Sequence, residues 1–498
     1  MSRFRPPGIR RSTTVAFGPI LAVAIVLGPC QAADPEGAER QYRMARRLAA
    51  EGSPEAGPAL MKVLELDPEG SRADDALVDR ALLAGIARWP EALGRVHPRA
   101  AAEARAFLDR TLNDHADSDR APEARYYRAL LFLEPIPGHD SAVARQQLIL
   151  STTRRDASDR ADAARYAVAW LDEQLGSDDR AMAGYQRLLV DAPSGPAGLR
   201  ARVGLARMLL RRGEFGAAAR WVQEALDGEV GSETDAAALR ELAVRLLTGR
   251  TAPTTAEVVL PTTGVRQPGS ICATRDGGLL LVDRKLGTVK LLGPTGKTLS
   301  TWTLQKLVDA ALGPRGSVFA ATEDEAFQLR ADGTQRRTAA LGEFDEPQAL
   351  ALDGIGGLWL LDRKGERLGR IAPGAGAPTT VWENKGARVT SMAWDGRRML
   401  MLGNRDKTLY AVASDGIATP LFGPTWQKPI LLAADHTGRV AVLDEKSGTV
   451  TTLGADGSSL GTFNWRGAGL KAPAGMAFGA DGVLHLLDQQ GGKWMRVR

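Results

Sequence analysis

The segment PQALALDGIGGLWLLD, residues 347–362, joins two apolar runs through a Gly-containing turn and ends on an acidic residue. This pattern, usually with its final acidic residue, occurs six times between Pro268 and Arg498, with its turns at Asp276-Gly277, Arg315-Gly316, Asp353-Gly354, Asp395-Gly396, Thr437-Gly438 and Asp481-Gly482. The turns are spaced by roughly 40 residues, which is the period of a β-propeller blade of four short strands. We therefore predict a β-propeller in the C-terminal half of the chain.

The repeat also predicts the number of blades and a way to close the ring. Six blades are expected to begin near Pro268, Leu304, Pro347, Val389, Pro429 and Pro473. The last blade reaches the end of the chain after three strands, whereas the β-rich segment Glu257–Leu260 precedes the first blade and has no blade of its own. We expect this segment to pair with the last blade, because that pairing removes an exposed strand edge.

The blades resemble NHL repeats. Pro347–Asp353 followed by Gly357–Arg363 is the best copy, and Pro473–Asp488 contains a similar one. Thr322 and Gly403 stand where the repeat expects its acidic residue, so two blades depart from the pattern. The resemblance covers residues 256–498 and implies a propeller fold. It implies little about function, because propellers of this type serve in binding, scaffolding and occasional catalysis.

Residues 37–249 are rich in Ala, Leu and Arg, which favour helices, and their apolar residues recur at intervals of three and four. Gly176–Ala181 followed by Tyr185, Leu188 and Pro193 resembles a tetratricopeptide repeat, and Gly213–Ala218 begins a second copy. In that family, Gly permits the turn between paired helices and Ala allows their close approach. The resemblance implies an α-solenoid of stacked helix pairs whose concave surface holds a peptide or a partner helix.

The first 32 residues have the pattern of a signal peptide. Four arginines precede the apolar stretch Val15–Leu27, which is too short to span a bilayer comfortably, and Cys30-Gln31-Ala32 fits the small-x-small cleavage rule. The alternatives are a twin-arginine signal at Arg10-Arg11, a lipoprotein acylated on Cys30, and an uncleaved anchor. All of them predict export to the periplasm or cell envelope.

Together these patterns divide the chain into a signal peptide (1–32), a TPR-like α-solenoid (33–248), a linker (249–255) and a six-bladed NHL-like β-propeller (256–498). The whole chain has 64 basic and 59 acidic residues, and removal of the leader with its four arginines lowers the net charge from +5 to about +1. This balance argues against nucleic acid as a partner. Cys272 would be the one cysteine left after cleavage, and we expect it to be a buried, unreactive thiol.

The candidate site lies on one face of the predicted ring. Acidic residues recur at the end of the second strand of four blades, and basic pairs follow two of them; the set is Asp283, Arg284, Lys285, Asp362, Arg363, Lys364, Asp444 and Asp488. The carboxylates could hold a cation or a cationic ligand, and the basic residues could form a rim for an anionic envelope polymer or an acidic partner. In the alternative interpretation, each aspartate caps its own turn by accepting backbone N–H bonds.

Other candidate chemistry is weaker. The two histidines of the propeller, His436 and His485, lack the spacing of metal ligands, and we find no catalytic signature, so we predict no metal, no cofactor and no enzymatic activity. Seven tryptophans could stack on sugars or pack between blades: Trp302, Trp359, Trp382, Trp394, Trp426, Trp465 and Trp494.

The preferred hypothesis is an exported, non-enzymatic scaffold whose solenoid and propeller each bind a protein partner. A second hypothesis is a propeller that binds a cell-wall glycan or a small ligand, and a third is a propeller lyase or hydrolase with a carboxylate site in its channel. Contact with a membrane is expected only if the N-terminus is retained or lipidated. The glycan hypothesis expects tryptophans and basic residues to converge on one face, and the enzyme hypothesis expects at least three ligands to converge in the channel.

Overall fold

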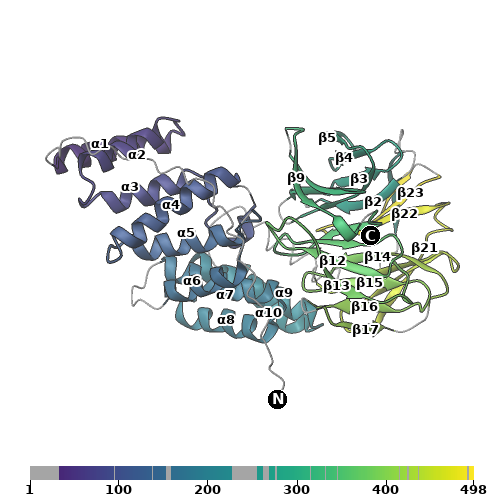
Figure 1. Cartoon of the computed structure of the whole chain (residues 1–498). Coiled ribbons are helices and arrows are strands. Elements are labelled where there is room, and N and C mark those ends of the chain that lie inside the picture. The colour runs from purple at the N-terminus through teal and green to yellow at the C-terminus, as the bar shows by residue number, and fades with distance from the viewer. Residues whose placement is uncertain are drawn as a thin grey trace, which may run out of the picture.

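The computed structural model describes residues 33–498 except 95, 137, 153–158, 227–254, 262–267 and the short propeller segments 275–276, 314–315, 331, 345, 414–415, 423–425, 436 and 491–492. Helices occupy the N-terminal part and a six-bladed β-propeller the C-terminal part (Figure 1), as predicted. The expected signal peptide, most of the expected linker and His436 lie outside the described residues. Within the described ranges, no helix has the length and apolar character needed to cross a membrane.

Successive helices of the N-terminal half pack against one another, and α3, α5, α7 and α9 also contact each other as one layer. Gly176 and Gly213 both adopt a φ of 75° in the turns that follow α7 and α9, a conformation that glycine adopts without steric cost. The helices are α1 (Pro35–Ala50), α2 (Ala56–Leu66), α3 (Ala73–Leu82), α4 (Pro98–Asp114), α5 (Ala121–Leu133), α6 (Ser141–Thr152), α7 (Asp159–Gln174), α8 (Asp178–Asp191), α9 (Gly195–Arg211) and α10 (Phe215–Leu226), with a 3-10 helix at Pro90–Ala92.

Small residues allow the helices to approach closely. A Cβ atom placed on Gly184 of α8 would lie 2.9 Å from the Cβ of Ala169 in α7, and one placed on Gly204 of α9 would lie 2.6 Å from the ring of Tyr185. Tyr185 is fully buried and belongs to an apolar core that runs from α3 to α9. Larger side chains at these glycines would separate the helices that form this core.

The propeller consists of six four-stranded antiparallel sheets. The first three blades are β2 (Pro268–Ala273), β3 (Leu279–Asp283), β4 (Thr288–Leu292) and β5 (Thr298–Thr303); β6 (Leu307–Leu312), β7 (Val318–Thr322), β8 (Glu325–Leu329) and β9 (Gln335–Ala340); and β10 (Ala349–Leu352), β11 (Leu358–Leu361), β12 (Arg367–Ile371) and β13 (Thr379–Glu383). The next two are β14 (Val389–Trp394), β15 (Met399–Gly403), β16 (Leu409–Val412) and β17 (Ala418–Phe422); and β18 (Pro429–Ala434), β19 (Val440–Asp444), β20 (Thr449–Leu453) and β21 (Ser459–Asn464).

The closing blade is made from both ends of the propeller sequence, as predicted. β22 (Pro473–Phe478), β23 (Leu484–Asp488) and β24 (Lys493–Val497) come from the C-terminus, and β1 (Ala256–Pro261) supplies the fourth strand. β1 runs antiparallel to β24, with Ala256 opposite Val497. The first strands of all six blades contact their neighbours around the ring, so the ring is continuous.

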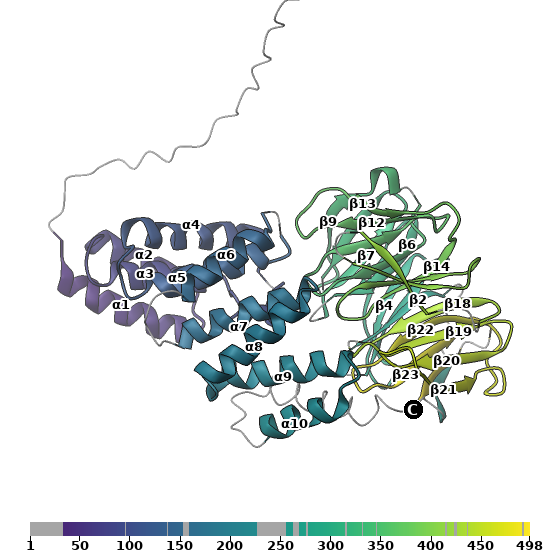
Figure 2. The same ribbon diagram turned by 90° about the horizontal axis from the view of Figure 1, so that it is seen from below.

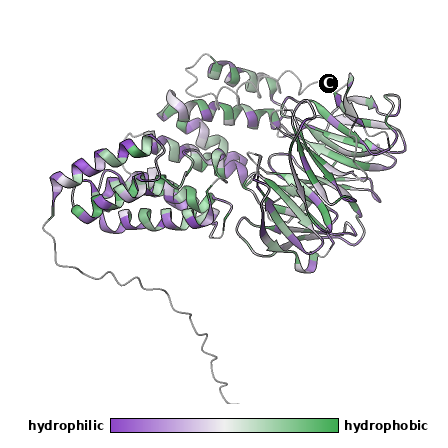
Figure 3. Cartoon of the chain, turned by 90° about the horizontal axis from the view of Figure 1, so that it is seen from above, coloured by the Kyte–Doolittle hydropathy of each residue, from purple (hydrophilic) through white to green (hydrophobic). Residues whose placement is uncertain are grey.

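The second strand of each blade is buried along its whole length. In Figure 3 the propeller strands are mainly hydrophobic, whereas the helices carry alternating hydrophobic and hydrophilic residues. This difference explains the sequence pattern: a strand covered on both sides reads as a continuous apolar run, and a half-covered helix reads as a periodic one.

Candidate functional site

The two ends of the propeller differ in what covers them. The turns between the first and second strands of the blades point toward the helical half, and the turns between the third and fourth strands lie at the same end. We call this the helix-facing end (Figures 1 and 2). The turns between second and third strands and the connections between blades lie at the opposite end, which we call the open face. The open face comprises residues 284–287, 304–306, 323–324, 341–348, 363–366, 384–388, 404–408, 426–428, 445–448, 465–472 and 489–493, of which 345 and 491–492 are not described.

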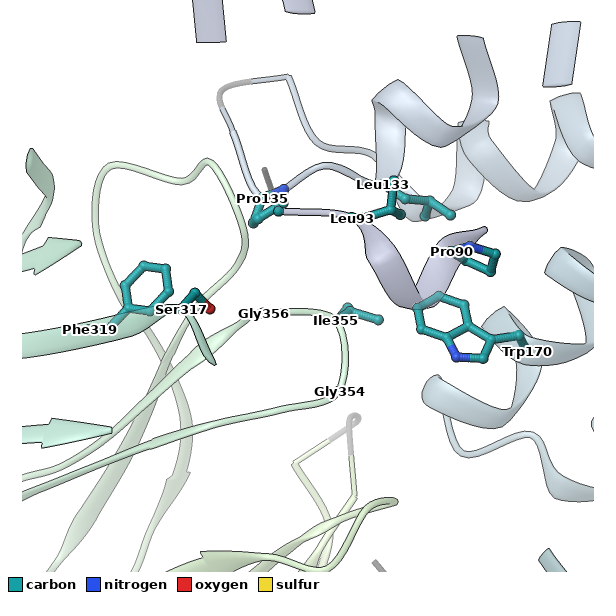
Figure 4. Close-up of a pocket in the computed structure, with 11 residues that line it drawn as sticks. Pro90, Leu93, Leu133, Pro135, Trp170, Ser317, Phe319, Gly354, Ile355 and Gly356 are labelled. Atoms are coloured by element: carbon teal, nitrogen blue, oxygen red, sulfur yellow. The ribbon is translucent and has the colours of Figure 1, made fainter. Parts of the chain in front are cut away.

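At the helix-facing end, the turn after β10 inserts into the helical half. Ile355 packs against the apolar core of the helices. A Cβ atom on Gly354 would meet the side chain of Gln174 at 1.7 Å, and one on Gly356 would lie 3.4 Å from Pro135. Figure 4 shows Ile355 beside Trp170 and the 3-10 helix, in a pocket of about 20 Å³, which is space for about one water molecule.

A buried carboxylate organises the inserted turn. Asp353 accepts hydrogen bonds from the backbone N–H groups of Ile355 at 3.1 Å and Gly357 at 2.7 Å, and from Trp359 Nε1 at 3.1 Å. Arg370 donates two further hydrogen bonds to its second oxygen, at 2.9 and 2.7 Å. Asp395 and Asp435 organise the equivalent turns of the next two blades with Arg398 and Arg439. The propeller therefore presents a preformed end to the helices.

A polar groove adjoins this apolar contact. Arg397 of the propeller pairs with Asp178 of α8 at 3.1 Å. The groove has a volume of about 470 Å³ and is lined by Gly176, Ser177, Asp178, Asp179, Arg180, Arg212 and Arg397. Burial raises the pKa of Asp178, although Arg397 opposes this shift. Since Arg212 also pairs with Asp179, at 2.9 Å, the charges of the groove are largely compensated within the protein.

On the open face, the aspartates that the sequence singled out cap turns. Asp283 is 1% exposed, and its Oδ1 accepts hydrogen bonds, both of 3.1 Å, from the backbone N–H groups two and three residues further on. Asp362 Oδ1 accepts hydrogen bonds of 2.7 and 2.9 Å from the N–H groups four and five residues further on. The capping alternative describes both residues.

The other two aspartates also hold the chain that enters their blade. Asp444 accepts hydrogen bonds from the N–H groups of residues 446 and 447, at 2.8 and 3.1 Å, and from those of residues 427 and 428. Burial raises the pKa of Asp444, but these backbone donors outweigh burial and hold it below its ordinary value. Asp488 accepts from the N–H groups of residues 471 and 472, at 3.2 and 2.6 Å. The four carboxylates lie in four separate turns and do not converge.

The basic members of the candidate site divide into two kinds. Arg284 donates to the carbonyl oxygen of Gln348 at 2.8 Å and thus crosses the open face from the first blade to the third, while Arg363 pairs with Glu346. Lys285 and Lys364 are exposed and form no ion pair with another described residue. The lysines are therefore the members of the site that are available to a partner.

The sequence interpretation missed Asp309, which lies on β6 and bonds to the first strands of both neighbouring blades. Asp309 is 2% exposed. It accepts one hydrogen bond from the hydroxyl of Ser270 in β2 and another, of 2.9 Å, from the backbone N–H of Leu350 in β10. Burial raises the pKa of Asp309, and the nearby Arg284 opposes this rise. The signal for this residue was an acid within the otherwise apolar run Leu307–Leu312.

No group of three or more potential metal-ligating side chains occurs in the described part of the chain. Cys272 packs among apolar residues of neighbouring blades, and burial raises the pKa of its thiol to about 12. His485 is fully buried and accepts a hydrogen bond from Trp494 Nε1 at 3.0 Å. All seven tryptophans of the propeller are buried or pack against apolar clusters, in agreement with the packing alternative: Trp302, Trp359, Trp382, Trp394, Trp426, Trp465 and Trp494.

The architecture defines the class of protein as a helical region joined to a six-bladed β-propeller. No family model and no curated protein matches this chain. Among solved structures, it resembles a streptogramin B lyase (TM-score 0.40, 13% identity, 49% of this chain and 97% of that one). It also resembles regucalcin, a calcium-binding protein from Agrobacterium tumefaciens (TM-score 0.41, 16% identity, 50% of this chain and 94% of that one). A third similar structure is the PQQ-bound aldose sugar dehydrogenase of Streptomyces coelicolor (TM-score 0.37, 16% identity, 50% of this chain and 100% of that one). At such scores and identities, the likeness concerns the propeller fold alone.

Proposed function

We propose that this chain is an exported, non-enzymatic scaffold of the cell envelope, in which a TPR-like helical half recruits protein partners and the NHL-like propeller presents a second binding surface. The observation that carries the proposal is the contact between the two halves. Ile355 packs against the helical core, and Arg397 pairs with Asp178 beside it. Since this contact occupies the helix-facing end, the outer surface of the helices and the open face are left to point away from each other.

The helical half offers apolar side chains to a partner. Ile149 and Leu150 on α6 are 38% and 46% exposed, and Val190 at the end of α8 is 82% exposed. Its charged groups, by contrast, are largely paired with each other, as in the contacts of Arg120 with Asp75 and Asp79, both at 2.8 Å. Exposed apolar groups on a surface of compensated charge favour recognition of a protein or a helix over recognition of a polyion.

Photo-crosslinking with the full-length chain tests this function. A photoreactive amino acid replaces Val190 in one variant and Ile417, which is 61% exposed at the helix-facing end of the propeller, in a matched control. We expect discrete protein adducts from envelope fractions at position 190 and few at position 417. Equal labelling at the two positions, or no protein adduct at position 190, contradicts recruitment through the helices.

A second candidate is binding of a glycan or a small ligand at the channel mouth. Arg284 reaches across the open face close to Asp309 and Ser270, so cationic, carboxylate and hydroxyl groups meet at this point. Titration of the full chain with cell-wall fragments, compared with an Arg284→Ala variant, tests this candidate. Binding that the substitution abolishes favours it over the scaffold.

A further inference from the structure

Lysine is rare in this chain and gathers on one surface. Of its 12 lysines, Lys62, Lys290 and Lys297 lie elsewhere. The remaining nine all belong to the open face: Lys285, Lys306, Lys364, Lys385, Lys407, Lys428, Lys446, Lys471 and Lys493. The helix-facing end, which has the same number of turns, carries only Lys297. The distribution of lysine thus follows the two ends of the propeller.

Most of these lysines are available to an external anion. Lys306 pairs with Glu323 at 2.6 Å, and Lys428 pairs with Glu445. The other seven form no ion pair with any described residue, and five of them are exposed, the exceptions being the half-buried Lys407 and Lys493. The arginines of the helix-facing end are different: Arg398 and Arg439 are each bound to an aspartate of their own turn, and Arg370 of β12 is bound to Asp353 in a turn of its own blade.

The backbone of the open face adopts an unfavourable conformation at four of its charged residues. Four non-glycine residues adopt a positive φ in the described part of the chain, and all four lie on the open face. Glu346, at 51°, is acidic, and the other three are basic: Lys306 at 55°, Arg388 at 49° and Lys407 at 56°. Glycine occupies this conformation without steric strain, whereas a lysine or an arginine does so at a cost. A basic side chain at each of these positions is therefore present despite a local penalty.

The arrangement favours an extended, flat anion. Lys285, Lys364 and Lys446 occupy the same turn of the first, third and fifth blades, so they are spread around the whole ring and cannot converge on one compact ligand. Protein interfaces are usually built on a central apolar or aromatic cluster. Among the described residues of the open face, Leu286 is the one large apolar side chain that is substantially exposed, at 39%.

We propose that the open face docks, by its lysines, on the surface of a lipid bilayer that carries anionic headgroups. Lysine side chains near such a surface are attracted by its negative potential without inserting into it. The helical half, which covers the opposite end of the propeller, would then point away from the membrane toward its partners. The inference rests on the proposed function only in taking the open face as a binding surface.

Vesicle co-sedimentation with the full-length chain tests the proposal. The probes are vesicles of phosphatidylcholine alone and vesicles in which about a third of the lipid is phosphatidylglycerol. We expect binding to the anionic vesicles only, and weaker binding as salt is added. The triple variant K285E/K364E/K446E should bind at least about a hundredfold more weakly. The matched control K62E/K290E/K297E makes the same charge change at the three lysines outside the open face and should bind like wild type.

Three outcomes overturn the proposal: wild-type protein that ignores anionic vesicles, a triple variant that binds like wild type, and a control that loses as much binding as the triple variant. Thermal unfolding of both variants shows whether they remain folded. Crosslinking of partners at position 190 is read separately. If wild-type protein does not bind anionic vesicles but still crosslinks partners at position 190, only the lipid surface is rejected, and the reverse result rejects only recruitment by the helices.

Discussion

The two halves of this protein join their repeating units by different means. Neighbouring helices are linked by arginines that bridge carboxylates of different helices, as where Arg120 meets Asp75 and where Arg160 meets Glu123 at 2.7 Å. The blades of the propeller are joined through buried apolar strands and the β1–β24 pairing. The helical half therefore depends on matched charges between its units, and the propeller depends on apolar contact and ring closure.

This comparison also explains how the chain uses its two basic residues. Arginine presents a rigid fork of donors that suits partly buried carboxylates, whereas lysine is a hydrated point charge that stays at the surface. The arginines of both halves are largely engaged in internal pairs, for example Arg370 with Asp353 and Arg72 with Glu39. Nine of the 12 lysines, by contrast, lie on the open face. Arginine is thus used mainly for ion pairs within the protein, and lysine mainly on the exposed open face.

Removal of β1 is expected to have the largest effect, because it breaks the joint on which the propeller depends. Replacing Ala256–Pro261 with a Gly/Ser segment of equal length keeps the connection to the helices but leaves β24 without its partner. The loss should exceed about 4 kcal/mol and appear in calorimetry as a lower unfolding temperature for the whole propeller. A variant that melts like wild type contradicts closure by this strand.

The closure was predictable from sequence, and the reason is physical. A strand that is buried on both faces must be apolar throughout, and a hairpin that turns tightly needs glycine, so each blade leaves a recognisable phrase such as residues 347–362. The last blade has only three strands from the C-terminus, and the β-rich segment around Val258 belongs to no other blade. Pairing of this segment with the last blade is therefore the arrangement that the sequence predicts. The contact between the halves leaves no such pattern, since Ile355 reads like any other apolar turn residue.

Substitution of Glu173 tests the joints of the helical half. This residue of α7 is fully buried. Its carboxylate accepts two hydrogen bonds from Arg207, at 2.7 and 2.6 Å, and one from the hydroxyl of Tyr185, at 2.8 Å, and it forms an ion pair with Arg211. Glu173→Gln keeps the shape but leaves two partly buried guanidinium groups without their counter-charge. We expect a loss of about 3–5 kcal/mol of unfolding free energy in denaturant titrations.

The control for this prediction is Glu36→Gln. Glu36 pairs with Arg40 at 3.6 Å on α1, and its side chain is 90% exposed. Because solvent screens such a pair, its removal should leave the unfolding midpoint unchanged. If both substitutions cost the same, burial of the ion pairs does not matter to the helical half.

The candidate site was only partly predictable. The sequence located the ends of the second strands, and Asp283 and Asp362 do lie there, but sequence spacing cannot show whether a carboxylate faces a ligand or its own backbone. Hydrogen bonds to N–H groups two to five residues further on are a property of the folded turn. Asp309 was missed because its partners, Ser270 and Leu350, lie about 40 residues away on either side, in neighbouring blades.

A pH titration sharpens the contrast between the paired buried charges of the helices and an unpaired buried base in the propeller. Burial lowers the pKa of His485 to about 4, from an ordinary value of 6.5. Between pH 6.5 and 4, His485 is protonated in the unfolded chain but stays neutral in the folded chain. The unfolding free energy of the propeller should therefore fall by up to about 3 kcal/mol as the pH drops from 6.5 to 4. Above pH 6.5 this contribution is constant.

His485→Gln isolates this effect from the titration of other groups. Glutamine can still accept the hydrogen bond from Trp494 but does not titrate. The difference in stability between wild type and variant should therefore change between pH 6.5 and 4 and stay level between pH 7 and 8. A difference that is independent of pH over the whole range contradicts the assignment to His485.

The smallest effect is expected at the contact between the helical half and the propeller. Ile355 is half-buried among helical residues, so Ile355→Ala should cost about 1–2 kcal/mol, less than a fully buried isoleucine would. The matched control is Leu299→Ala, because Leu299 is 55% exposed on β5 and should contribute little. Since the substitution weakens the contact and neither core, calorimetry should show the helical half and the propeller unfolding in two better-separated transitions. If they instead keep the wild-type profile while the control shifts, the halves are joined elsewhere, and the Arg397–Asp178 pair, at 3.1 Å, becomes the contact to remove next.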